Sequence, residues 1–175
     1  MVKSEENRAM YEAFDETEED FENTQENKFL TFRLGKEEYG IEIKDVTEII
    51  GIQNITEVPD MPEYVKGVIN LRGKVIPVMD VRMRFKMQPF EYNDRTCIIV
   101  IDVEKKPVGL IVDYVSEVVD IPSQNVEPPP QVSKNSNNIF LKGIGKVGDS
   151  IKILLETEKI LYAEFLEKVK EEIKL

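Results

Sequence analysis

The side chains with the greatest chemical potential in this sequence are one cysteine, Cys97, a surplus of carboxylates and the glycine-rich stretch GIGKVG at 143–148. Histidine, the commonest general base and metal ligand, is absent from all 175 residues. Acid-base catalysis by two carboxylates requires a shared cleft, and no pair stands out from ordinary surface charge. We therefore predict a protein that is not an enzyme and has no catalytic, cofactor or metal site.

The cysteine and the glycines both have structural explanations. Cys97 lies inside TCIIVIDV, where a small buried residue is expected, and a catalytic thiol would need an activating group other than histidine. The GIGKVG stretch matches a nucleotide-binding fingerprint that turns a strand into a helix, but the strand-like SIKILLE follows it here. We predict that these glycines serve the tight turn of a β-hairpin.

Charge and hydropathy limit the possible partners. The net charge of −11, with no stripe of Lys and Arg among aromatic residues, argues against a nucleic-acid partner. No apolar run approaches the roughly 20 residues needed to cross a bilayer, so direct membrane insertion is not expected. Because there is one cysteine and no signal-peptide pattern near Met1, we expect a cytoplasmic location.

The chain from Lys28 onward is expected to be mainly β. Short β-branched and aromatic runs such as KFLTFRL and TCIIVIDV alternate with turn-prone stretches, as in barrels and sandwiches. Single helical turns are predicted at KDVTE and PEYVKG. An amphipathic helix is predicted over residues 157–175, where four apolar side chains recur every four positions. They are Leu161, Phe165, Val169 and Ile173.

Residues 1–27 have a different composition. They contain ten acidic and two basic side chains and few aromatic residues, so we predict a mobile acidic tail. The alternative is a short amphipathic helix with a docking stripe. That stripe would consist of Met10, Tyr11, Phe14 and Phe21.

An internal repeat organises the rest of the chain. A shift of 69 residues places the segment that begins at Phe29 over the segment that begins at Ile98. After a seven-residue insertion, KGVINLRGKVIPVMDV at 66–81 aligns with KGIGKVGDSIKILLET at 142–157. Each copy holds about five strands, and closing so small a sheet removes exposed edges. We therefore predict two similar β-barrels.

The predicted organisation follows from this repeat: an acidic tail at 1–27, a first β-barrel subdomain at 28–90, a second at 91–156 and a C-terminal helix at 157–175. Exchange of strands between the two barrels is left open, because the strand after NLRG could cross to the other barrel.

The repeat also separates structural from functional features. Arg72 lies at a turn in NLRGKVIPVMDVR, and its counterpart in the second copy is Gly148, so the barrel itself does not require an arginine there. Arg72 is either an ordinary solvated side chain or an interface anchor, a role in which Arg is enriched. Glu48 and Gly67 have identical counterparts and are predicted to be structural.

Several segments together resemble a known family: the start at Phe29, EEYGIEI, KGVINLRGKVIPVMDVR at 66–82, GLIVDYVSEV at 109–118 and KGIGKVGDSIKILL at 142–155. They resemble CheW, the chemotaxis coupling proteins, from about Lys28 to about Leu161. This resemblance implies two tandem five-stranded SH3-like barrels with a hydrophobic groove between them. It also implies a scaffold that binds the regulatory domain of the CheA kinase through one barrel and the cytoplasmic helical hairpin of chemoreceptors through the groove.

The resemblance implies partner-binding roles for seven positions, some of them acting indirectly by shaping the barrel. They are Val46, Glu48, Gly67, Arg72, Gly73, Cys97 and Ile98. Arg72 is the strongest candidate, because its guanidinium could bond receptor oxygens while Val46 and Ile98 contact a helix face. Such a protein would be cytoplasmic and recruited to membrane-associated receptor arrays. The alternatives are a generic SH3-like peptide-binding module and an enzyme with an unrecognised carboxylate site.

Overall fold

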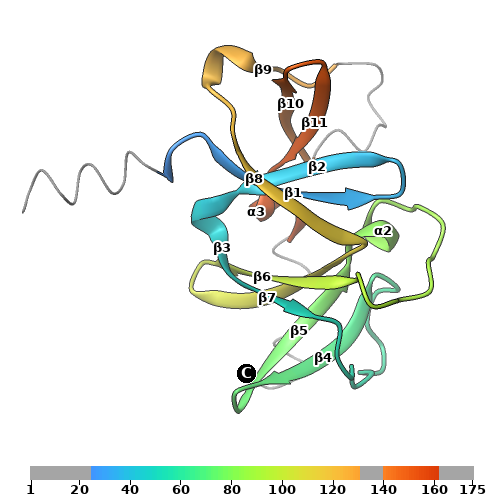
Figure 1. Cartoon of the computed structure of the whole chain (residues 1–175). Coiled ribbons are helices and arrows are strands. Elements are labelled where there is room, and N and C mark those ends of the chain that lie inside the picture. Colours follow the sequence, from blue (N-terminus) through green and yellow to red (C-terminus); the bar gives the residue numbers. More distant parts are fainter. Residues whose placement is uncertain (1–24, 131–139, 162–175) are drawn as a thin grey trace, which may run out of the picture.

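The computed structural model describes residues 25–130 and 140–161, and within these ranges the chain is built from strands joined by short turns and helical segments (Figure 1). The strands of the first half are β1 (Lys28–Leu34), β2 (Glu37–Glu42), β3 (Val46–Gly51), β4 (Val65–Leu71) and β5 (Lys74–Asp80). Those of the second half are β6 (Cys97–Val103), β7 (Lys106–Val112), β8 (Tyr114–Asp120), β9 (Val126–Glu127), β10 (Leu141–Val147) and β11 (Ser150–Leu155). The helical segments are η1 (Ile43–Asp45), α2 (Val81–Arg84), η2 (Ser123–Asn125) and α3 (Thr157–Ile160).

The described strands form two sheets that lie one above the other in Figure 1. One sheet has five strands in the order β3-β6-β7-β5-β4, and the other has six in the order β8-β1-β2-β11-β10-β9. Each sheet contains two β-hairpins, which are joined by one parallel pairing, β5 with β7 in one sheet and β11 with β2 in the other. The predicted mainly-β fold with two similar sheets is confirmed, and the two-residue β9 supplies the sixth strand.

The two halves of the chain exchange their first two strands. β1 and β2 belong to the sheet completed by β8 to β11, whereas β6 and β7 belong to the sheet completed by β3 to β5. The chain crosses between sheets at η1, which follows β2, and at Asp113, which lies between β7 and β8. A boundary between residues 90 and 91 therefore separates the two copies of the repeat and not the two sheets.

Several local predictions can be compared with the structure. The helical turn predicted at KDVTE (44–48) is present only in part, because η1 ends at Asp45 and β3 begins at Val46. PEYVKG is not helical: Val65 N donates to Pro62 O at 2.9 Å in a tight turn, and β4 follows directly. In GIGKVG only Gly148, with φ of 58°, occupies the hairpin turn, while the earlier glycines lie inside β10. The tail predicted at 1–27 and the helix at 157–175 lie mostly outside the described residues; α3 is the described part of the latter.

The largest hydrophobic core lies between the two sheets, and each sheet also encloses a smaller one. Alternate residues of β6 illustrate this arrangement, because both faces of the strand are buried. Ile99 and Ile101 face the core between the sheets, whereas Ile98 and Val100 face the core enclosed by the five-stranded sheet. Burial on both faces explains why the strand is a nearly continuous apolar run.

A partly buried ion pair connects the two sheets at the second crossing point. Arg82, in α2 after β5, donates to both carboxylate oxygens of Asp113 at 2.6 Å, and both side chains are less than one-fifth exposed. Asp113 also accepts the Gly35 N–H from the β1–β2 turn at 2.8 Å. A bidentate Arg–carboxylate pair is geometrically specific, so it fixes the five-stranded sheet against the six-stranded one.

Candidate partner-binding surface

Arg72 and Gly73 form the two-residue turn of the β4–β5 hairpin. Their φ angles are 51° and 83°, the positive pair that a type I′ turn requires. Gly73 adopts this conformation without strain, and its N–H donates to Asn70 Oδ1 at 2.9 Å. A non-glycine residue at positive φ is uncommon, so Arg72 occupies a position that glycine or asparagine would fill more easily.

The side chain of Arg72 reaches across to β3 and forms an ion pair with Glu48. β3 and β4 are the two edge strands of the five-stranded sheet, so this contact links edges that share no strand pairing. The Arg72 side chain is 73% exposed and that of Glu48 is 27% exposed. The second copy has no equivalent of this ion pair: the counterpart of Glu48 is Glu117, but the counterpart of Arg72 is Gly148.

Gly67 is structural, as predicted from the repeat. It lies in β4 with φ of 141°, and a Cβ added there would be only 2.0 Å from the carbonyl oxygen of Thr56. Thr56 bridges to Val68 of the same strand, and only glycine permits so close an approach. A Cβ added to its counterpart Gly143 would likewise lie only 2.7 Å from the carbonyl oxygen of Glu127.

The other three candidate residues lie on the paired strands β3 and β6, with Val46 at the opposite end of the pairing from Cys97 and Ile98, and at different depths. Val46 begins β3, pairs with Ile101 and packs against the core between the sheets. Cys97 begins β6, is half-buried, and its thiol donates to the Arg95 carbonyl at 3.3 Å. Ile98 is fully buried, so it can shape the sheet but presents no surface to a partner.

Two exposed apolar residues that the sequence reasoning missed extend this surface. Ile49 on β3 and Val118 on β8 are 44% and 50% exposed. Ile49 pairs with Ile99 and Val118 pairs with Leu30, and both partners belong to the core between the sheets. The two exposed side chains therefore mark the places where that core reaches the surface, at one edge strand of each sheet.

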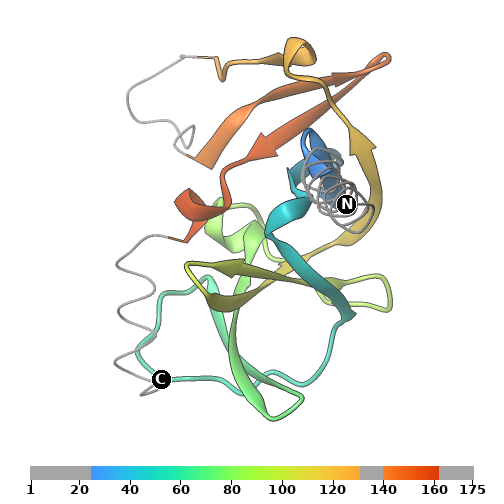
Figure 2. The same cartoon turned by 90° about the vertical axis from the view of Figure 1, so that its left-hand side faces the viewer.

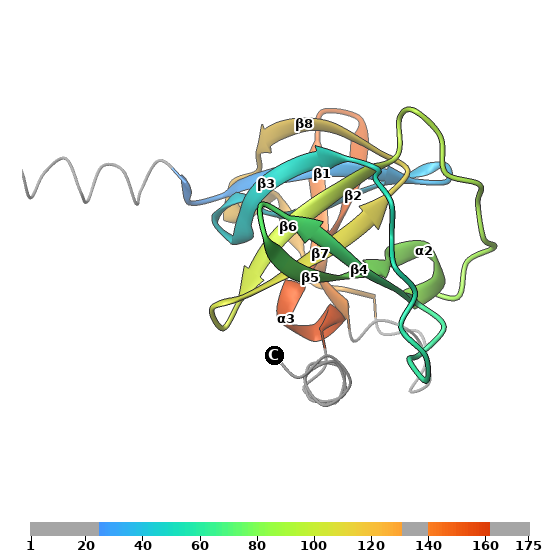
Figure 3. The ribbon, with the colours of Figure 1, turned by 90° about the horizontal axis from the view of Figure 1, so that it is seen from below.

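β3 and β8 lie on the same side of the molecule, as Figures 2 and 3 both show. We call the surface formed by Val46, Ile49, Val115 and Val118 the β3–β8 face. Val46 and Val115 are half-buried against the inter-sheet core beneath it. Ile49 and Val118 are 69 residues apart, so the repeat places them in equivalent positions, and this correspondence was the signal available in the sequence.

A second repeat-related pair of exposed apolar residues lies on the hairpins. Val75, two positions after the β4–β5 turn centre, is 44% exposed, and its counterpart Ile151 on β11 is 60% exposed. These hairpins point to opposite ends of the molecule in Figure 1. We call the two surfaces the hairpin ends.

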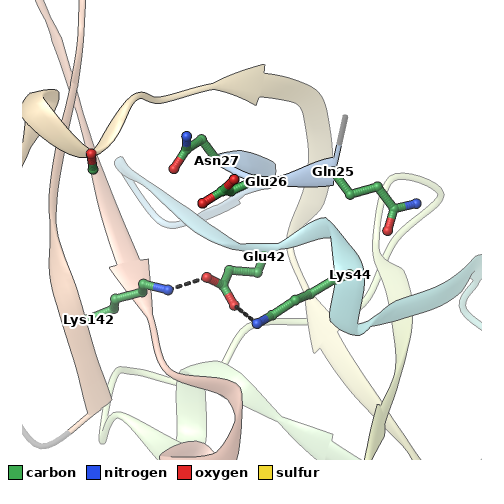
Figure 4. A pocket seen from close by; sticks show the side chains of 7 residues that line it. Gln25, Glu26, Asn27, Glu42, Lys44 and Lys142 are labelled. Atoms are coloured by element: carbon green, nitrogen blue, oxygen red, sulfur yellow. Dashed lines mark hydrogen bonds and ion pairs between the residues drawn. The ribbon is translucent and has the colours of Figure 1, made fainter. Parts of the chain in front are cut away.

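An open pocket of about 740 Å³ lies between the start of β1, the end of β2 and β10 (Figure 4). Glu42 lies at its centre and pairs with Lys142 and with Lys44, the latter at 3.1 Å. Burial raises the pKa of Glu42, but hydrogen bonds from both lysines and their positive charges outweigh it, so that the pKa lies below its ordinary value of 4.5. Because Glu42 occupies both ammonium groups, the pocket offers no free cation pair to an anionic ligand.

Within the described residues, no group of three or more potential metal ligands comes together. In the same part of the chain, no helix has the length and apolar character needed to cross a membrane.

Comparison with known proteins identifies relatives across most of the chain. A family model described as the CheW-like domain matches residues 28–165. The chemotaxis protein CheW of Klebsiella aerogenes is 38% identical over 137 residues, which cover 78% of this chain and 82% of that protein. The chemotaxis protein CheW of Treponema pallidum is 31% identical over 151 residues, covering 84% and 89%. The crystal structure of the scaffolding protein TtCheW from Thermoanaerobacter tengcongensis superimposes with a TM-score of 0.72 and 36% identity over 79% of this chain and 90% of that one.

Proposed function

The chain belongs to the CheW-like family of chemotaxis scaffold proteins, and we propose that it couples chemoreceptors to the CheA histidine kinase without catalysing a reaction itself. In this role it is a cytoplasmic protein that joins membrane-associated receptor arrays by binding their cytoplasmic parts. The coupling requires two separate surfaces, so that one partner does not displace the other.

The observation that carries the proposal is the β3–β8 face, where the core between the sheets reaches the surface at Ile49 and Val118. An amphipathic helix places apolar residues at intervals of three and four positions, and such a stripe docks on an apolar surface of this kind. We assign this face to the cytoplasmic helical hairpin of a receptor. Glu48 precedes Ile49 on β3 and points to the opposite side of the strand, so we propose that its ion-pair partner Arg72, whose side chain is 73% exposed, donates to polar groups of the hairpin at the margin of this face.

The hairpin ends are the proposed surface for the regulatory domain of CheA. Val75 and Ile151 expose apolar area on the β4–β5 and β10–β11 hairpins, which point to opposite ends of the molecule (Figure 1). The family resemblance implies that one barrel binds the kinase, so one of these two residues lies in the contact and the other remains exposed. This arrangement leaves the β3–β8 face open to the receptor while the kinase is bound.

The test is a reciprocal titration by calorimetry with four single variants of the full chain: Ile49→Asp, Val118→Asp, Val75→Asp and Ile151→Asp. Each replaces a half-exposed apolar side chain with a charge, which removes about 1 kcal/mol or more of apolar burial from a contact at that position. Because 1.4 kcal/mol corresponds to a factor of ten, a loss of about 1 kcal/mol weakens binding about fivefold, and a variant in a contact should weaken it by at least that factor.

Two outcomes decide between the assignments. Ile49→Asp and Val118→Asp are expected to weaken binding of a receptor hairpin while leaving the CheA regulatory domain unaffected, and one of the other two variants is expected to do the reverse. Because the four substitutions are chemically alike, each pair controls for the other. Uniform effects on both partners, or none on either, would contradict the division into two surfaces.

A further inference from the structure

We propose that the β3–β8 face takes its helical partner in one direction only, with a carboxylate of the partner held by Arg95 beside the ring of Tyr114. The inference rests on the proposed function, because it names what a receptor hairpin needs at one end of its apolar stripe. It adds a basic site that none of the seven candidate positions includes, although the nearby Cys97 is one of them.

Arg95 and Tyr114 lie where one end of β3 comes close to one end of β8. Tyr114 is the first residue of β8, and the Arg95 guanidinium lies over its ring, 4.2 Å from the ring centroid. The carbonyl oxygen of Thr96, next to Arg95, accepts the N–H of Ile52, directly after β3, at 3.2 Å. Tyr114 and Val115 point to opposite sides of β8, so the stacked pair lies at the margin of the face.

The guanidinium of Arg95 is available to a partner. Arg95 is exposed, and no carboxylate within residues 25–130 and 140–161 forms an ion pair with it. An arginine can lie over an aromatic ring and still donate its N–H groups to a carboxylate. A second guanidinium, that of Arg33, lies 5.9 Å from the centroid of the same ring.

The charges around this ring leave an excess of positive charge. Arg33 pairs with Glu38 at 3.5 Å, and Glu38 also pairs with Lys152. Even with the exposed Asp94 counted, Arg33, Arg95 and Lys152 thus carry three positive charges against two negative ones. We call Arg33, Arg95 and Tyr114 the basic end of the face. Its chemistry fits an acidic side chain.

The repeat places acidic residues at the equivalent end of the other sheet. The Ile52 N–H donates to the Thr96 carbonyl oxygen, and the Ile121 N–H donates to the Asn27 carbonyl oxygen at 2.8 Å, so bonds 69 residues apart are equivalent here. The repeat therefore holds in three dimensions at this point. The counterparts of the basic end are all acidic: Asp102 for Arg33, Glu26 for Arg95 and Asp45 for Tyr114.

The acidic counterparts lie at the opposite end of β3 from Arg95. Asp45 directly precedes Val46, the first residue of β3, and Asp102 follows the β6 residue that pairs with Val46. Lys44, which is also at this end, is already paired with Glu42 at 3.1 Å. A helix with a carboxylate at one end of its apolar stripe is thus attracted in one direction and repelled in the other.

The test is calorimetric titration of the cytoplasmic helical hairpin of a receptor from the same organism into full-length Arg95→Gln and Lys105→Gln. Arg95 and Lys105 are both exposed and lie two residues beyond opposite ends of β6, so each variant removes one positive charge at a different end. Arg95→Gln should raise Kd about two- to fivefold, as expected for a partly exposed ion pair, and should make Kd less sensitive to salt. Lys105→Gln should change neither.

A scan of the hairpin then locates the partner's carboxylate. Each acidic residue that flanks the apolar stripe of the hairpin is changed singly to its amide and titrated into the wild type and Arg95→Gln. One of these changes, at one end of the stripe, should raise Kd in the wild type and have little further effect in Arg95→Gln, because both substitutions remove the same contact.

Two results would overturn the inference: a Kd that rises no more in Arg95→Gln than in Lys105→Gln, or additive effects for every acidic residue of the hairpin. In either case Ile49→Asp still weakens binding if the receptor assignment is right, so the inference can fail while the proposed function stands. A folded wild type that does not bind the hairpin would overturn both. Thermal melting of each variant verifies that the comparison is made between folded proteins.

Discussion

Replacing Arg72 with asparagine should weaken receptor binding while leaving the thermal stability of the protein almost unchanged. Arg72 occupies the first position of a type I′ turn with φ of 51°, and Gly73 occupies the second. Asn-Gly is the sequence that this turn prefers, because asparagine tolerates positive φ better than arginine does. The variant Arg72→Asn therefore keeps the hairpin geometry and removes the guanidinium and its ion pair with Glu48.

The change in stability should be small because two effects oppose each other. An ion pair in which the Arg72 side chain is 73% exposed contributes about 0.2–1 kcal/mol. Relief of the unfavourable backbone conformation returns up to about 1 kcal/mol. For a chain of this size 1 kcal/mol shifts Tm by roughly 2–4 °C, so we expect Arg72→Asn to melt within about 4 °C of the wild type.

The change in receptor binding should be large. An arginine that anchors an interface typically contributes about 2 kcal/mol or more, which corresponds to roughly a 30-fold rise in Kd. Calorimetric titration of a receptor hairpin into the wild type and Arg72→Asn measures this ratio. Glu48→Gln is the matched control, because it removes the same ion pair and leaves the guanidinium available to the receptor.

Three results would refute this reasoning. A Kd that rises less than about threefold in Arg72→Asn would show that the guanidinium is not an anchor. A Tm lowered far beyond a few degrees would show that the exposed ion pair is needed to hold the edges of the sheet together. Equal losses of binding in Arg72→Asn and Glu48→Gln would show that the ion pair, and not a contact made by Arg72, supports the receptor site.

Three further predictions concern the fold. Gly67→Ala should cost several kcal/mol or prevent folding, because its Cβ would be 2.0 Å from a carbonyl oxygen, whereas Gly51→Ala, with nothing within 4 Å, should shift urea unfolding only slightly. Arg82→Ala should cost about 1–3 kcal/mol in urea unfolding, because the mostly buried carboxylate of Asp113 loses its two hydrogen bonds from the guanidinium and keeps the one from the Gly35 N–H. The pKa of Glu42 is lower in the folded protein than in the unfolded chain, so ionised Glu42 stabilises the fold above about pH 4.5. This contribution is lost as the pH falls through the folded pKa, and Glu42→Gln should therefore reduce the change of Tm with pH in that range.

The fold was largely predictable because its pattern is local and occurs twice. Strand-like runs such as TCIIVIDV became β6, and the repeat predicted two similar sheets. The exchange of strands was not predictable from the repeat. β1 and β6 are equivalent copies, and either could join either sheet without changing the alignment. The sheet that each strand joins is set by the short crossings at η1 and at Asp113. Asp113 forms an ion pair with Arg82, a contact that the sequence does not indicate.

The candidate surface was predictable only in part. Sequence singled out Arg72 because the second copy has glycine at that position, and the structure places Arg72 on an exposed turn. The same comparison grouped Glu48 with structural residues because Glu117 is identical, yet Glu48 forms the ion pair with Arg72. Identical residues in two copies can thus have different partners, and the repeat alone does not reveal this.

The sequence did not identify Ile49 and Val118 as surface residues, for a different reason. In the central strand β6, apolar residues on both faces are buried, so an apolar run by itself indicates core. On an edge strand the same side chain is covered on one flank only, and Ile49 and Val118 are about half exposed. Whether a strand lies at an edge depends on the order of strands in the sheet, which the sequence does not state.

The internal symmetry constrains how a partner can be oriented on the β3–β8 face. Ile49 and Val118 are equivalent by the repeat, so the apolar contacts alone would accept a helical partner in two opposite directions with similar energy. Discrimination between them requires a feature present on one side only. Arg72 with Glu48 is such a feature, because the other copy has Gly148 and Glu117 at the corresponding positions. Apolar burial therefore contributes affinity on this face, and the choice of direction must come from groups as asymmetric as this ion pair.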